Sequence, residues 1–229
     1  MNLVMLDIDG TLTQSYEYDQ EIFGLAIAEV LGCAPVKADL NGYVDKTSTG
    51  VTQEAILRIT GRIPKVEQIE QVKRNMLGRL KRMYQESPKI FCEVPGAARF
   101  LERLRSLDGV GTVIATGCWR NEALFKLKAS GLNVSGVPMA TSDDDKNRTR
   151  IMQIAAERAQ DFYGCPGFEQ VVYLGDGPWD LQEARSLGYH FIGIGPRVQA
   201  LRDTGIARWH PDFMEIEAVL ASVVTVLKP

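Results

Sequence analysis

The chain has 229 residues, of which 45% are hydrophobic and 24% charged, and its formal net charge is -3. These values are ordinary for a soluble globular protein that buries a core. The small net charge gives no long-range attraction to nucleic acid or to an anionic membrane, so we expect neither as a partner. The four cysteines form no CxxC pair, and we expect reduced thiols in a cytoplasmic protein without a signal peptide.

The first apolar run, residues 3–6, ends at Asp7, and Asp9 follows two positions later. Such a run predicts a buried strand that delivers an acid to the edge of a sheet. The two-residue period places both acids on the same side of that strand. Carboxylates held this close repel each other unless a cation lies between them or one keeps a proton. They therefore suit a metal-bound nucleophile and a general acid, while Gly10 permits a sharp turn close to a bound anion.

Helical patterns follow at residues 19–31, 52–60 and 64–86, with a loop expected over 34–50. Strand patterns then alternate with helical ones. We expect strands over 111–115, 137–140, 171–174 and 191–194, and helices over 97–107, 121–129, 149–159, 181–186 and 216–227. This alternation predicts an α/β fold with a Rossmann-like parallel sheet core and helices on both faces. The helical patterns between residues 19 and 86 separate the first strand from the later ones. This predicts a core domain over 1–13 and 92–229 and an inserted helical domain over 14–91.

Polar residues also follow two later strands. Thr116 and Gly117 come directly after the strand expected at 111–115, where a hydroxyl and exposed backbone amides can donate to an anion. Asp176 follows the strand expected at 171–174, and Asp180 lies four residues further on. Oxygen ligands of this kind suit a hard cation such as Mg²⁺. Because ligands bind beyond the carboxyl ends of parallel strands, we expect these side chains to share one site.

The segment Asp-Ile-Asp-Gly-Thr-Leu at residues 7–12 resembles the first motif of the haloacid-dehalogenase-like (HAD) hydrolase superfamily. Thr116 is similar to its second motif, and the Gly-Asp-x-x-x-Asp pattern at 175–180 to its fourth. The helical insert stands in the place of the family's C1 cap. In detail the chain is most similar to phosphoglycolate-phosphatase-like and phosphoglucomutase-like members.

The resemblance implies a role for each matched residue. Asp7 is the implied nucleophile, Asp9 the general acid and base, and Thr116 a donor to the phosphoryl oxygens. The family's third motif is a cation, and here Arg148 or Lys146 is implied. The implied Mg²⁺ ligands are Asp7, Asp9 through its backbone carbonyl, Asp176 and Asp180. The residues implied to contact the substrate are Gly10, Thr11 and Gly117, with Asp45 and Lys46 in the cap loop as candidates that are equally well explained as solvent-facing charges.

These roles predict a Mg²⁺-dependent phosphatase that acts on a small phosphorylated metabolite through an aspartyl-phosphate. Family dehalogenases lack the second acid at the position of Asp9, and phosphonatases carry a small residue there, so both activities are disfavoured. Two alternatives stay open: a phosphomutase, which shares all four motifs, and a non-catalytic partner protein that keeps the fold. The sequence leaves the identity of the substrate and the oligomeric state open.

Overall fold

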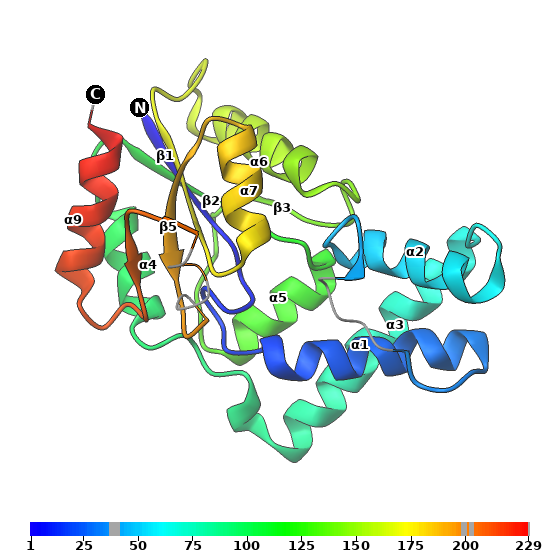
Figure 1. The fold of residues 1–229 in the computed structure, drawn as a ribbon. Helices are drawn as coiled ribbons and strands as arrows, with labels where there is room; N and C mark the ends of the chain where they lie inside the picture. The colour runs from blue at the N-terminus through cyan, green and yellow to red at the C-terminus, as the bar shows by residue number, and fades with distance from the viewer. Residues whose placement is uncertain (37–41, 198–200, 202–203, 229) are drawn as a thin grey trace.

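The structure, a computed structural model, describes residues 1–36, 42–197, 201 and 204–228. Its centre is a sheet in which all neighbouring strands run parallel, in the order β3-β2-β1-β4-β5-β6 (Figure 1). The strands are β1 (Asn2–Leu6), β2 (Val110–Ala115), β3 (Met139–Ala140), β4 (Val171–Gly175), β5 (His190–Ile194) and β6 (Trp209–His210). A parallel order of this kind confirms the α/β fold and the Rossmann-like sheet expected from the sequence.

Helices cover both faces of the sheet (Figure 1). On one face, α4 (Ala97–Arg105), α5 (Arg120–Ala129) and α9 (Ile216–Leu227) pack against Val4 and Leu6 of β1. On the other face, α6 (Arg148–Tyr163) and α7 (Pro178–Ser186) pack against Leu3 and Met5. Successive residues of a strand point to opposite faces, so an unbroken apolar run is what a strand buried on both sides requires.

The helices inserted between β1 and β2 form a separate apolar cluster beside the sheet (Figure 1). They are α1 (Tyr16–Leu31), α2 (Ser48–Thr60) and α3 (Val66–Glu86), followed by the short helix η2 (Pro88–Ile90). Phe23, Val51 and Met76, one from each long helix, are buried in this cluster together with Trp119 from the core. We call these helices and the loops between them the cap.

The register of β1 brings the functional positions to one edge of the sheet. Leu6, the last residue of β1, pairs with Ile114 of β2 on one side and with Leu174 of β4 on the other. The three strands therefore end at nearly the same level, and the residues that follow them meet above the carboxyl edge. The segments that begin at Asp7, Thr116 and Asp176 are the ones brought together.

The element boundaries differ from the sequence expectation in a few places. The helix α2 begins at Ser48, inside the expected loop, because the Thr47 side chain accepts a hydrogen bond from the Gly50 amide and caps it. The remainder of that loop includes residues 37–41, which lie outside the described residues. The helix α7 begins at Pro178, three residues early, since proline suits the first turn of a helix. The two-residue strand β6 was not expected, because it is too short to show a period.

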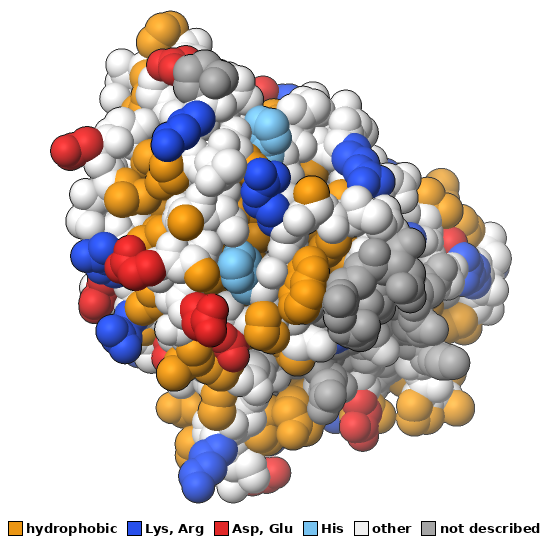
Figure 2. Space-filling model, turned by 60° about the vertical axis from the view of Figure 1, so that its left-hand side comes forward, with side chains coloured by type: hydrophobic (Ala, Val, Ile, Leu, Met, Phe, Trp, Pro, Cys, Tyr) orange, Lys and Arg blue, Asp and Glu red, His pale blue; other side chains and the backbone are white. Residues whose placement is uncertain are grey.

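Charges of both signs are scattered among hydrophobic side chains on the face shown in Figure 2, and the described side chains there gather into no field of one sign. Within the described parts of the chain, no helix has the length and apolarity that crossing a bilayer demands.

Candidate active site

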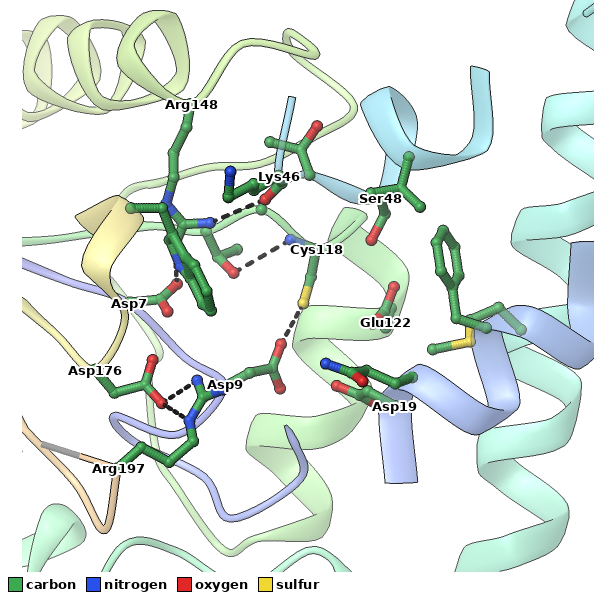
Figure 3. A pocket seen from close by; sticks show the side chains of 18 residues that line it. Asp7, Asp9, Asp19, Lys46, Ser48, Cys118, Glu122, Arg148, Asp176 and Arg197 are labelled. Carbon is green, nitrogen blue, oxygen red and sulfur yellow. Dashed lines mark hydrogen bonds and ion pairs between the residues drawn. The ribbon is translucent and has the colours of Figure 1, made fainter. Parts of the chain in front are cut away.

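A cavity of about 80 Å³ lies between the carboxyl edge of the sheet and the cap (Figure 3). Core residues that line it include Asp7, Asp9, Thr116, Gly117, Arg148 and Asp176. The cap contributes Asp19, Phe23, Lys46, Val51 and Met76. Asp7, Thr116 and Asp176, which follow three separate strands, therefore line a single cavity, whereas Gly10 and Asp180 are not among the residues that line it.

Asp7 lines the cavity and faces Arg148, the first residue of α6. The guanidinium is 2.9 Å from the Asp7 carboxylate and 2.8 Å from that of Asp180, and all three side chains are at least nine-tenths buried. Burial raises the pKa of Asp7 well above its ordinary value, although the Arg148 charge opposes the change. A carboxylate in this position needs positive charge beside it to stay ionised, and Arg148 supplies part of that charge.

Asp7, Asp176 and Asp180 form a buried group of acids whose oxygens lie within 4.8 Å of one another. One oxygen of Asp176, Oδ1, is buried and has no hydrogen-bond partner. Burial raises the pKa of this carboxyl to about 7, against the charge of Arg197. An all-oxygen donor set with an unpartnered acceptor fits a hard divalent cation such as Mg²⁺. These residues therefore fit the metal expected from the sequence.

Asp180 also has a structural task. Its Oδ2 atom accepts hydrogen bonds from the amides of Asp176 and Gly177, at 3.1 and 3.0 Å, and so caps the start of α7. Its other oxygen, Oδ1, faces Arg148. Asp180 thus holds Asp176 and Arg148 in place whether or not it touches a metal ion directly.

Asp9 lines the same cavity but has different partners from Asp7. The strand β1 ends at Leu6, so the two-residue alternation does not extend to Asp9. Its carboxylate accepts hydrogen bonds from Ser15, from the Cys118 thiol at 2.6 Å and from the Lys126 ammonium at 3.1 Å. Burial opposes ionisation of this carboxyl, but the charge of Lys126 and these hydrogen bonds outweigh it, so the pKa of Asp9 is lowered.

Glycines allow the close approaches that the site requires. Gly10 has a positive φ of 81°, and a side chain there would meet Asp176 Oδ2 at 1.7 Å. A side chain at Gly117 would meet the Arg148 guanidinium at 2.7 Å. Thr116 and Thr11 are both buried, and the Thr11 hydroxyl has no hydrogen-bond partner, although Thr11 does not line the cavity.

The structure separates the two candidates for the cation of the third motif. Arg148 lines the cavity, whereas Lys146 does not; the Lys146 side chain is 54% exposed and lies 3.6 Å from Asp45. Asp45 is likewise outside the cavity lining. Lys46, from the same cap loop, lines the cavity, and its backbone carbonyl accepts a hydrogen bond from Arg148.

The cap loop is joined to the core beside the cavity. The Ser48 amide donates to the carbonyl of Gly117 at 2.8 Å, and the Thr47 hydroxyl donates to the carbonyl of Lys146 at 2.6 Å. The Thr49 amide and hydroxyl both bond Ser142. These hydrogen bonds hold the cap loop against the core loops beside the cavity.

Sequence reasoning missed several residues of the site. Arg197, which donates to Asp176 through Nε at 2.8 Å, follows β5 in a segment without a recognisable pattern. Lys126, Glu122 and Asp19 meet at a buried cluster beside Asp9. The i,i+4 spacing of Glu122 and Lys126 was the only signal available, and such pairs usually lie on a solvated helix face.

Comparisons with solved structures agree with this architecture. A hydrolase from Pseudomonas syringae is 22% identical, with a TM-score of 0.71, and the match covers 97% of this chain and 99% of that one. CbbY from Rhodobacter sphaeroides, solved in complex with phosphate, is 20% identical with a TM-score of 0.67, over 94% and 96% of the two chains. A predicted phosphoglycolate phosphatase from Haemophilus somnus 129pt is 16% identical with a TM-score of 0.59, over 96% and 98%. At these identities the likeness establishes the fold.

No curated protein sequence matches the chain significantly. A family model for haloacid dehalogenase-like hydrolases, however, matches residues 1–188. The match spans the cap and the strands that carry Asp7, Thr116 and Asp176. With its sheet order, its inserted helices and this match, the chain belongs to the haloacid dehalogenase-like hydrolase family.

Proposed function

We propose that this protein is a Mg²⁺-dependent phosphatase that hydrolyses a small-molecule phosphate monoester through an aspartyl-phosphate on Asp7. The observation that carries the proposal is the surroundings of the Asp7 carboxylate. It stands at the end of the central strand, 2.9 Å from the Arg148 guanidinium, and shares a buried acid group with Asp176 and Asp180. A nucleophilic carboxylate and a phosphoryl group both need positive charge beside them, which Arg148 supplies and to which a cation held by the three acids would add.

In the first step, an oxygen of Asp7 attacks phosphorus and the bond from phosphorus to the ester oxygen breaks. The leaving alcohol takes a proton from Asp9. Lys126 favours the ionised form of Asp9 in the free protein, but a phosphate arriving beside it adds negative charge and favours its protonation. Arg148 and the Thr116 hydroxyl then stabilise charge on the phosphoryl oxygens.

In the second step, Asp9 accepts a proton from water, and the oxygen of that water attacks phosphorus. The bond between phosphorus and Asp7 breaks, which releases inorganic phosphate and restores the carboxylate. Mg²⁺ held by Asp7, Asp176 and the backbone carbonyl of Asp9, with Asp180 as ligand or support, would supply further positive charge at the phosphoryl group. The chain itself supplies the nucleophile in Asp7, the proton donor and acceptor in Asp9, and the charge-stabilising guanidinium in Arg148.

The closed cap supports a small substrate. The contacts of Thr47, Ser48 and Thr49 with core loops hold the cap beside the cavity, and a volume of about 80 Å³ leaves little room for a macromolecule. CbbY, which shares the fold, has been solved with phosphate and with xylulose-(1,5)bisphosphate. A phosphorylated metabolite is therefore the class of substrate that we propose.

The test measures phosphate release from a panel of small phosphate esters with Mg²⁺ and again with EDTA. We expect release that requires Mg²⁺ and that Asp7→Asn abolishes without unfolding the protein. Asp161→Asn, at an exposed position of α6, is the matched control and should keep full activity. Acid quenching with a labelled ester should trap phosphate on the wild-type protein and none on Asp7→Asn.

Other results would assign a different function. Isomerisation of a sugar phosphate without net release would identify a phosphomutase. Mg²⁺ binding with no turnover of any ester would favour a non-catalytic role. Near-normal release by Asp7→Asn would overturn Asp7 as the nucleophile.

A further inference from the structure

Beside Asp9, one side of the cavity is lined by two acids that the proposed chemistry does not use. Asp19 comes from α1 of the cap and Glu122 from α5 of the core, and both line the cavity close to Asp9 (Figure 3). We call Asp9, Asp19 and Glu122 the acidic wall. The Lys126 ammonium contacts all three carboxylates, at 3.1 Å from Asp9 and 2.6 Å from Glu122.

The single lysine does not satisfy the acidic wall. Three carboxylates surround one ammonium, and the side chains of Glu122 and Asp19 are only 4% and 15% exposed. One oxygen of each, Glu122 Oε2 and Asp19 Oδ1, is buried without a hydrogen-bond partner. Buried acceptors of this kind are costly unless a donor reaches them. Both side chains line the cavity, so rotation of either carboxylate would turn its unpartnered oxygen toward a donor on a bound molecule.

The cations of the cavity lie elsewhere. Arg148 contacts Asp7 and the carbonyl of Lys46, and Arg197 contacts Asp176, so these positive charges gather around the phosphate and metal end (Figure 3). Near Asp7, two arginines and the cation expected among Asp7, Asp176 and Asp180 offset the acids. Near Glu122, one lysine faces three carboxylates, so the excess of acid lies at that end of the cavity. A substrate with a negative phosphate at one end and a positive group at the other matches this pattern.

The remaining walls of the cavity suit a short carbon chain. Phe23, Val51 and Met76 from the three cap helices line it, and all are buried. A space of about 80 Å³ admits only a few non-hydrogen atoms besides the phosphate. Apolar side chains can pack against the methylene groups that separate the two charged ends.

We propose that the acidic wall binds the ammonium group of a small amino-alcohol phosphate, with Glu122 and Asp19 as the residues that recognise it. This inference rests on the proposed phosphatase function and adds the class of the leaving group. The ammonium donates hydrogen bonds to Glu122 Oε2 and Asp19 Oδ1 while the phosphate faces Asp7. Leaving groups with a carboxylate or a second phosphate meet like charge at this wall and are disfavoured.

The experiment compares three esters of similar size whose far ends are cationic, neutral and anionic: 2-aminoethyl phosphate, propyl phosphate and carboxymethyl phosphate. We expect kcat/KM to fall in that order in the presence of Mg²⁺. In Glu122→Gln and in Asp19→Asn, the preference for the aminated over the propyl ester should fall about tenfold. Glu21→Gln, an exposed position on α1, is the matched control and should keep the wild-type preference.

The outcomes separate this inference from the proposed function. Mg²⁺-dependent hydrolysis of p-nitrophenyl phosphate would support the phosphatase function. If that protein hydrolyses carboxymethyl phosphate at least as efficiently as 2-aminoethyl phosphate, the inference is overturned and the phosphatase function stands. If no ester is hydrolysed, calorimetry with the same three esters still tests the wall, and equal binding of all three overturns the inference. Because the wild-type ranking requires no variant, a failure of Glu122→Gln to fold leaves that ranking as the deciding result.

Discussion

The Arg148 guanidinium lies 2.9 Å from the Asp7 carboxylate, and the two side chains are 8% and 5% exposed. The same guanidinium also contacts Asp180 and the hydroxyl of Tyr173. Its Nε atom is buried without a partner. Arg148 thus tethers the nucleophile candidate to α7, and its planar guanidinium is the kind of group that pairs with phosphoryl oxygens.

Arg148→Lys should lower kcat/KM by about a hundredfold, because a lysine ammonium lacks the planar fork that contacts two acids at once. Lys146→Ala is the comparison, since Lys146 is exposed and pairs with Asp45 outside the cavity. We expect that variant to stay within about twofold of the wild type. Steady-state kinetics with one phosphate ester decides between the two cations, and a larger loss in Lys146→Ala would reverse the assignment.

Much of the site was predictable because strand ends are visible in sequence. Asp7, Thr116 and Asp176 each follow an apolar run, and parallel strands bring such positions together. The choice between Lys146 and Arg148 could not be predicted, because a single residue separates them and local sequence does not say which of the two side chains faces inward. Lys126 was also hidden, since a lysine on a short helix is normally exposed, whereas here the ammonium is buried against Asp19 of the cap and Asp9 of the core.

Asp176→Asn should weaken Mg²⁺ binding by about tenfold or more, because the neutral amide removes a charged oxygen from the acid group. The buried Oδ1 atom of Asp176 has no protein partner, so the metal is the group expected to use it. The rise in melting temperature on adding Mg²⁺ measures the effect. Asp161→Asn again serves as control, and an unchanged Mg²⁺ response in Asp176→Asn would remove this residue from the metal site.

Lys126→Met should lower the free energy of unfolding by about 3–5 kcal/mol, because it leaves buried carboxylates without their counter-ion. Lys128→Met, at an exposed position of the same helix, should have little effect. Loss of the ammonium raises the folded-state pKa of the remaining acids, so the variant gains stability relative to the wild type as the pH falls. Urea unfolding at pH 8 and pH 5 tests this, and a gap that widens at pH 5 would contradict it.

Asp144→Asn tests the loop that precedes Arg148. Both oxygens of Asp144 accept hydrogen bonds from Arg158, each at 2.7 Å, and the Thr141 amide donates to the same carboxylate. Although burial opposes the effect, the hydrogen bonds from Arg158 and Thr141 and the Arg158 charge lower the pKa of Asp144. A lowered folded-state pKa means that the ionised group stabilises the fold above its unfolded pKa, near 4, and that this stability is lost as the pH falls through the folded value.

Because the Arg158 side chain is 38% exposed, solvent screens the pair, and we expect Asp144→Asn to cost only about 1 kcal/mol at pH 7. The difference from the wild type should shrink as the pH falls through the lowered folded-state pKa of Asp144, because the wild-type carboxyl then becomes protonated too. Asp108→Asn, at an exposed position, controls for the loss of an aspartate. Urea unfolding at several pH values measures the difference, and a cost that persists undiminished in acid would mean that the shape of the side chain, and not its charge, holds the loop.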